Sequence, residues 1–264
     1  MKLLVQSDDY GMSEACALGC LKGIQDGIIR NTGLFVNMPW TKKCVEWIKP
    51  YLGEIAFGID LNISSGAPVL PASEIPGLVQ SNGQFLTSQM HRSLDNDDND
   101  FDHLNFDEVY KEFDAQIKKF IELVGKKPDY LHGHAYGTKT TQCIMQELSK
   151  KYKIPLSTTL IHHKKVNAPS MEWYKYPVTY ENQLTCSLEE YILQDKAGFL
   201  DSEYGLLITH CGYVDNTLMK MTSFHLLRMK DLEGVTSPQV LKWIEKNQVE
   251  LITYRDISKL IWEE

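Results

Sequence analysis

Polar residues that could bind a metal ion or move a proton follow several short apolar segments of this chain. Six of them lie at such ends: Asp8, Asp9, Asp60, His132, His134 and His210. Carboxylates and imidazoles that converge from several strands can hold a divalent cation and leave coordination positions open. Of two adjacent carboxylates, one can bind the ion while the other takes a proton from the bound water. The pattern therefore indicates metal-assisted acid–base chemistry.

Each of these residues also has a structural interpretation. An aspartate at the end of a strand often caps the next helix, which explains Asp60, taken alone, as well as ligation does. Capping explains one carboxylate of the Asp8–Asp9 pair but not both. One of His132 and His134 could equally be a histidine of the core or surface whose hydrogen bonds are satisfied. Composition and spacing leave these alternatives open.

The elements that would position these residues alternate between short apolar and longer amphipathic segments. Strands are predicted over 2–6, 32–36, 54–60, 130–131, 156–161, 205–209 and 250–253, and helices over 13–28, 42–49, 106–123, 140–152, 187–194, 237–246 and 256–262. Repeated βα units bury a parallel sheet, either open or closed into a barrel. The sequence has no glycine-rich phosphate loop, which favours an α/β fold of the (β/α) barrel, TIM type. Such barrels carry their chemistry at the carboxyl ends of the strands.

One segment breaks this alternation. Residues 64–105 contain several prolines and glycines, with an acidic run over 95–100, and have no sustained periodicity. We expect a single domain over residues 1–264, with 64–105 as a loop insertion after the third strand. The acidic run is interpreted as a solvated loop, because it lacks the glycine and the terminal glutamate of a helix-loop-helix calcium site.

Composition excludes several classes of protein. The 264 residues include 27 Lys and Arg against 35 Asp and Glu, a net charge of −8, and 43% are hydrophobic. The acidic balance argues against nucleic acid as the main partner. No apolar run approaches the roughly 18 residues of a membrane span. The amino-terminal apolar stretch is too short for a signal peptide, and the six cysteines form no Cys-x-x-Cys pair, so we expect a cytoplasmic protein with no membrane partner.

An ordered series of motifs resembles the YdjC family of carbohydrate deacetylases. The matching segments are Ser7-Asp8-Asp9-Tyr10-Gly11, Gly58-Ile59-Asp60-Leu61-Asn62, Lys127-Pro128-Asp129-Tyr130-Leu131-His132-Gly133-His134, His210-Cys211-Gly212-Tyr213, and Arg228 with the segments 232–233 and 236–238. The match extends from Lys2 to about Ile257, nearly the whole chain. The order of the motifs is far more specific than any one of them.

The resemblance implies a distorted (β/α) barrel and a role for each matching residue. A divalent metal would be bound by Asp9, Asp60 and His134. Asp8 would be the general base, His210 a general acid or oxyanion partner, and Arg228 a residue that holds the base or touches substrate. His132 and Tyr213 are assigned to substrate binding. The aromatic residues Trp173, Tyr174 and Tyr176 could stack on sugar faces or simply pack.

The sequence departs from the family pattern within this site. Asp60 stands where the family has histidine, and His132 where it has aspartate, so the two could be an exchange that keeps one carboxylate and one imidazole. Tyr136 and Thr138 also occupy positions that are usually histidine. A carboxylate in place of an imidazole makes the site harder, which favours Mg²⁺, or Mn²⁺, over Zn²⁺.

The sequence thus predicts a metal-dependent hydrolase that removes the N-acetyl group from an amino sugar, such as a free or phosphorylated chito-oligosaccharide. Two alternatives remain open. The altered site could bind a sugar or sugar phosphate without deacetylation, or it could catalyse a different reaction on a phosphosugar. The expected partner is a small carbohydrate, and a homodimer is the base-rate expectation for a cytoplasmic enzyme.

Overall fold

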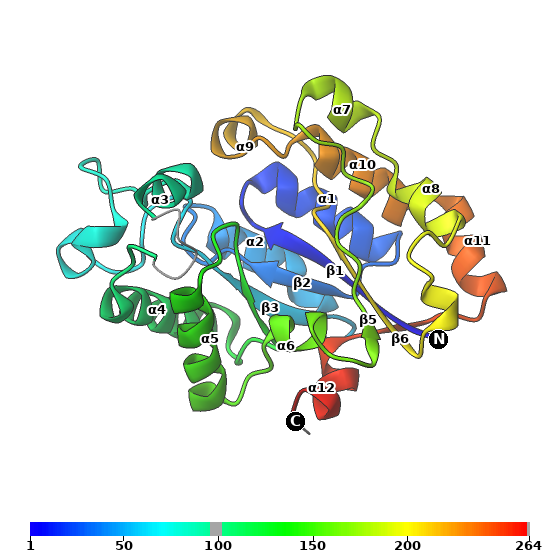
Figure 1. Cartoon of the computed structure of the whole chain (residues 1–264), viewed down its shortest axis with the longest axis horizontal. Helices are drawn as coiled ribbons and strands as arrows, with labels where there is room; N and C mark the ends of the chain where they lie inside the picture. The colour runs from blue at the N-terminus through cyan, green and yellow to red at the C-terminus, as the bar shows by residue number, and fades with distance from the viewer. Residues whose placement is uncertain (96–101, 263–264) are drawn as a thin grey trace.

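A parallel sheet forms the centre of the computed structural model, which describes residues 1–95 and 102–262 (Figure 1). Its strands are β1 (Lys2–Tyr10), β2 (Asn31–Leu34), β3 (Ala56–Leu61), β4 (Leu131–Gly133), β5 (Val166–Asn167), β6 (Tyr204–Thr209) and β7 (Glu250–Ile252). They lie in the order β4-β3-β2-β1-β6-β5, and β7 pairs with the start of β1. All these pairings are parallel, so the carboxyl ends of the strands share one edge.

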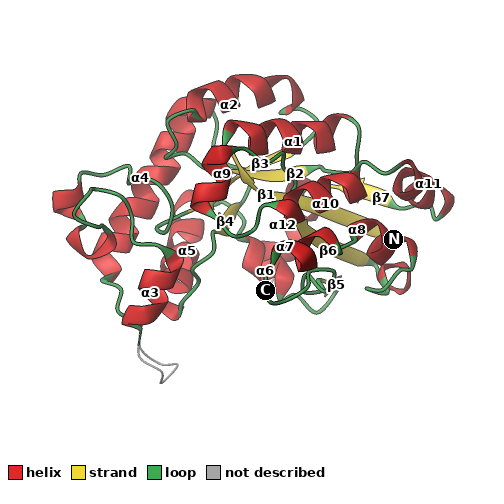
Figure 2. Ribbon diagram, turned by 90° about the horizontal axis from the view of Figure 1, so that it is seen from above, coloured by secondary structure: helices red, strands yellow, loops and turns green. Residues whose placement is uncertain are grey.

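Helices surround the strands and complete the βα units (Figure 2). The longer ones are α1 (Glu14–Gln25), α2 (Thr41–Ile48), α4 (Phe106–Val124), α5 (Lys139–Tyr152), α10 (Leu226–Val235), α11 (Pro238–Lys246) and α12 (Tyr254–Trp262). The shorter ones are α3 (Ser88–Leu94), α6 (Ser157–Ile161), α7 (Tyr180–Leu184), α8 (Leu188–Leu193) and α9 (Asn216–Met221). The architecture is the predicted distorted (β/α) barrel, left incomplete between β4 and β5 at the two ends of the strand order.

Local signals in the sequence account for the principal helices. The Ser13 side chain accepts a hydrogen bond from the Cys16 amide at 3.1 Å and caps α1, as its position predicted. Helix α4 begins after the Asn105 cap and ends at Gly125, whose φ of +82° is the left-handed conformation that glycine adopts readily. Both helices bury an apolar face against the sheet, but Leu18, which the predicted face of α1 included, is 45% exposed.

One predicted strand and one predicted strand end were wrong. The segment 156–161 reads as a strand because it is rich in β-branched and aliphatic residues, but only Leu156 pairs with β4, through a bridge to Leu131. From Ser157 onward the chain is helical as α6, so tertiary context overrides strand propensity here. The first strand is also longer than expected and continues through Tyr10, with a shift of register between Ser7 and Tyr10. Asp9 sits in this irregularity with a φ of +68°.

The insertion 64–105 lies at one end of the molecule, where α3 stands beside α4 and α5 (Figure 1). The acidic run, apart from Asp95, lies outside the described residues, so its predicted character as a solvated loop stays a prediction. Asp95 itself accepts hydrogen bonds from the Tyr136 hydroxyl and the His103 ring. No helix in the described part of the chain is long and apolar enough to cross a membrane.

Candidate active site

Successive inward-facing positions on four strands bring the predicted residues together. Side chains two apart on a strand point to the same face. The inner face begins with a small apolar cluster that includes Leu4 on β1, Ala56 on β3, Tyr130 just before β4 and Leu206 on β6. Continuing each strand by steps of two gives Asp8, Asp60, the pair His132 and His134, and His210. The sheet therefore delivers these side chains to the inside of its carboxyl edge.

Asp8 is the centre of one group of contacts. Its Oδ2 lies 3.1 Å from His132 Nε2 and 4.0 Å from His210 Nε2, and its Oδ1 accepts a hydrogen bond from the Gln6 amide. Burial alone would raise the pKa of Asp8, but the charge and hydrogen bond of His132 outweigh it and lower the pKa. Asp8 is thus held ionised at the inner face of the barrel.

The His132 ring pairs with the Asp8 carboxylate. Its Nδ1 lies 2.7 Å from Ser157 Oγ at the start of α6. Burial alone would lower the pKa of His132, but the charge of Asp8 and its hydrogen bond raise the pKa to about 9. His132 and Asp8 therefore form a buried ion pair at neutral pH, whereas the sequence assigned His132 to substrate binding. Contact with substrate stays a prediction for this residue.

Asp9 is the centre of a second group. Its Oδ1 lies 2.7 Å from His134 Nδ1, and its Oδ2 accepts a hydrogen bond from Arg228 Nη2 at 2.7 Å. Burial alone would raise the pKa of Asp9, but His134 and Arg228 hold the pKa well below its usual range. Arg228 was expected to hold the base or to touch substrate. It reaches Asp9, the neighbour of the predicted base, and its contact with substrate stays a prediction.

Asp60 differs from Asp8 and Asp9 because its surroundings raise the pKa of its carboxyl. Its Oδ2 accepts a hydrogen bond from the Asp9 amide at 2.6 Å, and its Oδ1 is a buried oxygen with no hydrogen-bond partner. Burial, reinforced by the charge of Asp8, raises the pKa of Asp60 well above its usual range, so the carboxyl favours its neutral form. The unpartnered oxygen lies over Gly33 of β2, where an added Cβ would come within 1.8 Å of it.

The predicted metal donors do not form a three-donor site in this arrangement. His134 and Arg228 already occupy the two oxygens of Asp9, and the free oxygen of Asp60 faces the backbone of β2. Over residues 1–95 and 102–262, no three His, Cys, Asp or Glu side chains are placed so that they could hold a metal ion. The disposition of donors therefore does not fit the expected ligand set, and metal binding stays a prediction.

The register of the sheet explains the Asp60 and His132 departures as a linked pair. Asp60 and His132 are directly opposite each other on β3 and β4. Opposed residues in a parallel ladder project to the same face, so the carboxylate and the imidazole are neighbours. The structure thus brings together the two residues whose exchange the sequence suggested.

His210 closes the site from β6. Its side chain is largely buried and turns Nε2 toward Asp8. Burial lowers the pKa of His210, and the nearby carboxylates Asp9 and Asp8 only partly oppose this. The neutral imidazole is therefore favoured, which suits a group that first accepts and then delivers a proton. The next predicted residue, Tyr213, is 43% exposed, and its backbone lies against α1. Its contact with substrate stays a prediction.

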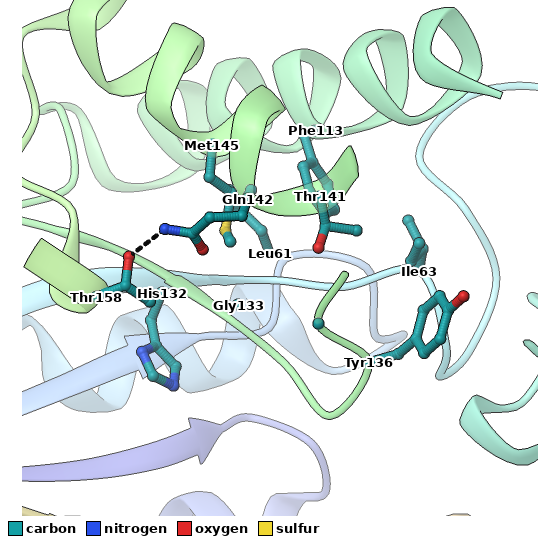
Figure 3. Close-up of a pocket in the computed structure, with 11 residues that line it drawn as sticks. Leu61, Ile63, Phe113, His132, Gly133, Tyr136, Thr141, Gln142, Met145 and Thr158 are labelled. Carbon is teal, nitrogen blue, oxygen red and sulfur yellow. Dashed lines mark hydrogen bonds between the residues drawn. The ribbon is translucent and has the colours of Figure 1, made fainter. Parts of the chain in front are cut away.

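A small cavity of about 100 Å³ lies between β4 and the helices α4 and α5, and the His132 ring points away from its other lining side chains (Figure 3). His132 and Gly133 of β4 form one wall, and Phe113 and Met145 of helices α4 and α5 line the other side. Pockets for drug-sized ligands are roughly 300–1,000 Å³. This cavity is smaller than such pockets, and Asp8, Asp9, Asp60, His134 and His210 are not among its lining residues.

Several residues of the site were not found from the sequence. Gln6 and Ser157 bind Asp8 and His132 directly, and Tyr254 donates to Gln6 Oε1 at 2.6 Å. Gln6 had a usable signal, because it precedes Asp8 by two positions on a predicted strand. Ser157 and Tyr254 had none, since each comes from a separate helix start far along the chain.

Fold and site together define a (β/α) barrel with paired carboxylates and imidazoles at the carboxyl edge of its sheet. The YdjC-like protein family model matches residues 2–246. This chain therefore belongs to the YdjC-like family, as the motifs indicated.

Proteins of known name are similar to nearly the whole chain, and solved structures share its fold. The chain is 28% identical to "Carbohydrate deacetylase 2" of Listeria innocua, over 98% of this chain and all of that protein. It is 26% identical to a carbohydrate deacetylase of Clostridium beijerinckii, over 97% and 100% of the two chains. A proposed cellobiose-phosphate cleavage protein of Enterococcus faecalis has the same fold, with a TM-score of 0.77 and 24% identity over 97% and 98% of the chains. A family 4 acetyl xylan esterase of Clostridium thermocellum superposes with a TM-score of 0.51 and 10% identity, over 98% and 91%.

Proposed function

We propose that this protein is a carbohydrate deacetylase that hydrolyses the N-acetyl group of an amino sugar. The observation that carries the proposal is the convergence of Asp8, Asp9 and His210 at one edge of the barrel, in a chain that is YdjC-like over residues 2–246. The full-length curated relatives named above are carbohydrate deacetylases, which supports the same chemistry. The substrate we propose is a chito-oligosaccharide or a related sugar, free or phosphorylated.

The side chains can supply the proton transfers that amide hydrolysis needs. As the water oxygen bonds to the acetyl carbon, Asp8 takes one proton, because its carboxylate is held ionised. The carbon–nitrogen bond then breaks, and the proton passes through His210 Nε2, 4.0 Å from Asp8, to the departing amine. The products are acetate and the free amino sugar.

The proposal includes dependence on a divalent metal, with Mg²⁺ first and Mn²⁺ or Zn²⁺ as alternatives. The family resemblance is its basis. Because Asp9, Asp60 and His134 do not converge as a ligand set in this arrangement, we assign no step to the ion. A homodimer and a cytoplasmic location also stay predictions, and size-exclusion chromatography with light scattering tests the first of them.

Acetate release tests the proposal directly. Protein stripped of metal is supplied in turn with Mg²⁺, Mn²⁺, Co²⁺ or Zn²⁺ and mixed with N-acetylglucosamine or its short β-1,4 oligomers. We expect metal-dependent release, and we expect Asp9→Ala to abolish both metal binding and turnover, whereas Asp107→Ala, an exposed aspartate of α4, leaves both intact. Full activity in Asp9→Ala would contradict the proposed site.

A second candidate function is binding of a sugar or sugar phosphate without turnover. The pairing of Asp8 with His132 favours it, because that ion pair weakens Asp8 as a proton acceptor. Titration calorimetry with amino sugars and their phosphates, with acetate assayed in parallel, separates the two functions. Tight binding with no acetate under any metal would favour the binding protein, and would make Asp60→His the next variant to examine.

A further inference from the structure

A buried chain of hydrogen bonds lies behind His210, on the side of the ring opposite Asp8. Asp231 of α10 is fully buried at its base. Its Oδ1 accepts from Trp173 Nε1 at 2.8 Å, and its Oδ2 accepts from the His210 backbone amide at 2.8 Å and from the Tyr174 hydroxyl. Indole and backbone N–H groups can only donate, and the Tyr174 hydroxyl directs its hydrogen to Oδ2, so Asp231 is the acceptor in all three bonds.

The direction of these bonds fixes the direction of the next one. Tyr174 has a single hydroxyl hydrogen, and that hydrogen is given to Asp231. The Tyr174 oxygen, left with lone pairs, lies 3.2 Å from His210 Nδ1. A bond between them therefore requires a proton on Nδ1. In the neutral imidazole the other nitrogen, Nε2, then carries a lone pair.

We infer that Tyr174, supported by Asp231, is a positioning residue that selects the Nδ1–H tautomer of His210. The inference deepens the proposed deacetylase function and rests on it for its catalytic meaning. The bare Nε2 faces Asp8 at 4.0 Å. His210 accordingly begins the reaction as a proton acceptor at Nε2, and the proton that it gives to the amine must first arrive there from the attacking water, directly or through Asp8.

Packing alone offers a simpler role for Tyr174. Its ring meets Trp173 edge-on at 5.3 Å and Phe224 at 5.8 Å, so the aromatic body fills space regardless of the hydroxyl. Tyr174→Phe separates the two roles, because it keeps the ring and removes only the oxygen. The hydrogen bond to His210 disappears, while Asp231 keeps its bonds from Trp173 and the His210 amide.

The tautomer is read by nitrogen NMR on protein labelled with ¹⁵N-histidine, with His210→Gln to assign the signals among the eight histidines. In the unaltered protein we expect Nδ1 to be protonated and Nε2 to be the bare nitrogen. In Tyr174→Phe we expect loss of this preference, and a kcat that falls roughly 10- to 100-fold with little change in KM. Near-ultraviolet circular dichroism verifies that the variant is folded.

Tyr191→Phe is the matched control. Tyr191 is also buried, packs on Trp173 at 5.1 Å, and places its hydroxyl on an acid, Glu172, at 3.3 Å. We expect removal of the Tyr191 hydroxyl to leave the His210 signals and kcat unchanged.

The outcomes separate this inference from the proposed function. An Nε2–H tautomer in the unaltered protein, or an unchanged tautomer in Tyr174→Phe, overturns the inference whatever the activity. A tautomer that shifts in Tyr174→Phe but not in Tyr191→Phe supports it, even if no acetylated sugar is hydrolysed. Absence of hydrolysis would overturn the proposed deacetylase function and leave the inference about the tautomer standing.

Discussion

Asp9 carries the most tightly compensated charge of the site. It accepts from Arg228 and lies against His134, and the side chains of Asp9 and Arg228 are 2% and 1% exposed. Arg228 also donates from Nε to the Phe224 carbonyl at 2.7 Å. A buried ion pair of this kind adds little net stability, but removal of one member leaves the other charge buried without its partner, which is strongly destabilising. A variant that changes only Asp9 or only Arg228 is therefore expected to lose folding stability as well as any role of that residue in the site.

We predict that Arg228→Met destabilises the fold by about 3–5 kcal/mol, because it leaves Asp9 buried with only His134 as partner. In Asp9→Asn/Arg228→Met neither charge remains, so the double variant should cost clearly less than the sum of the single ones. Urea unfolding of the four proteins measures the coupling. Lys196→Met, which breaks an exposed pair with Glu190, is the control and should cost less than about 1 kcal/mol. Additive effects of Asp9→Asn and Arg228→Met would show that the two residues do not depend on each other.

Helix α10 illustrates which elements the sequence could and could not predict. Strands β1, β3 and β6 and helices α1, α4, α5 and α11 follow from apolar periodicity and capping residues, because each has a continuous apolar face. Helix α10 was missed. Its buried positions include Arg228 and Asp231, three residues apart on one face. Because these two charged residues interrupt the buried face, the sequence lacks the continuous apolar stripe from which a helix is predicted.

The candidate site divides in a similar way. Asp8, Asp60 and His210 could be placed from sequence because each ends an apolar segment, and parallel strands share their carboxyl edge. Their partners Ser157, Tyr174 and Asp231 come from helices and loops distant in the chain, whose approach depends on tertiary packing. The sequence therefore could not predict which side chains bind these partners, or the charge state that results for each group.

Helices α4 and α5 are joined by Asp114, and this junction should respond to acid. Asp114 lies 2.6 Å from Lys151 Nζ, 2.7 Å from Lys118 Nζ and 2.8 Å from the Tyr152 hydroxyl. Burial alone would raise the pKa of Asp114, but these hydrogen bonds lower it. A carboxylate whose pKa is lower in the folded chain stabilises it above the unfolded pKa, about 3.9, and loses that contribution as the pH falls through the folded pKa.

We predict that Asp114→Asn lowers the free energy of unfolding by about 1–2 kcal/mol at pH 7. The difference from the unaltered protein should shrink as the pH is lowered below about 4, because the native carboxyl is then protonated as well. Urea unfolding followed between pH 7 and the acid limit of folding measures this. Asp107→Asn, exposed on the same helix, should show almost no difference at any pH. A deficit in Asp114→Asn that persists undiminished in acid would contradict the linkage.

At the scale of the whole molecule, the insertion is attached to the barrel by buried polar bonds. Glu112 of α4 is fully buried and accepts the Val69 amide at 2.9 Å and the Leu70 amide at 3.1 Å, one on each oxygen. Gln116, one turn later, donates to Glu112 and to the Asn62 carbonyl at the end of β3. Because these bonds connect the insertion, α4 and the strand that carries Asp60, the insertion is expected to fold with the barrel as one domain.

We predict that Glu112→Gln loosens the insertion before it affects the barrel. The amide can accept from only one of the two backbone N–H groups and points a donor at the other, which should cost about 1–3 kcal/mol. Hydrogen exchange followed by mass spectrometry should show shared protection of the insertion and the strands in the unaltered protein, and early opening of residues 66–86 in the variant. Glu122→Gln, exposed on the same helix, should change neither. If the insertion of the unaltered protein already exchanges well before the strands, the chain is not one cooperative unit, and the single-domain prediction is wrong.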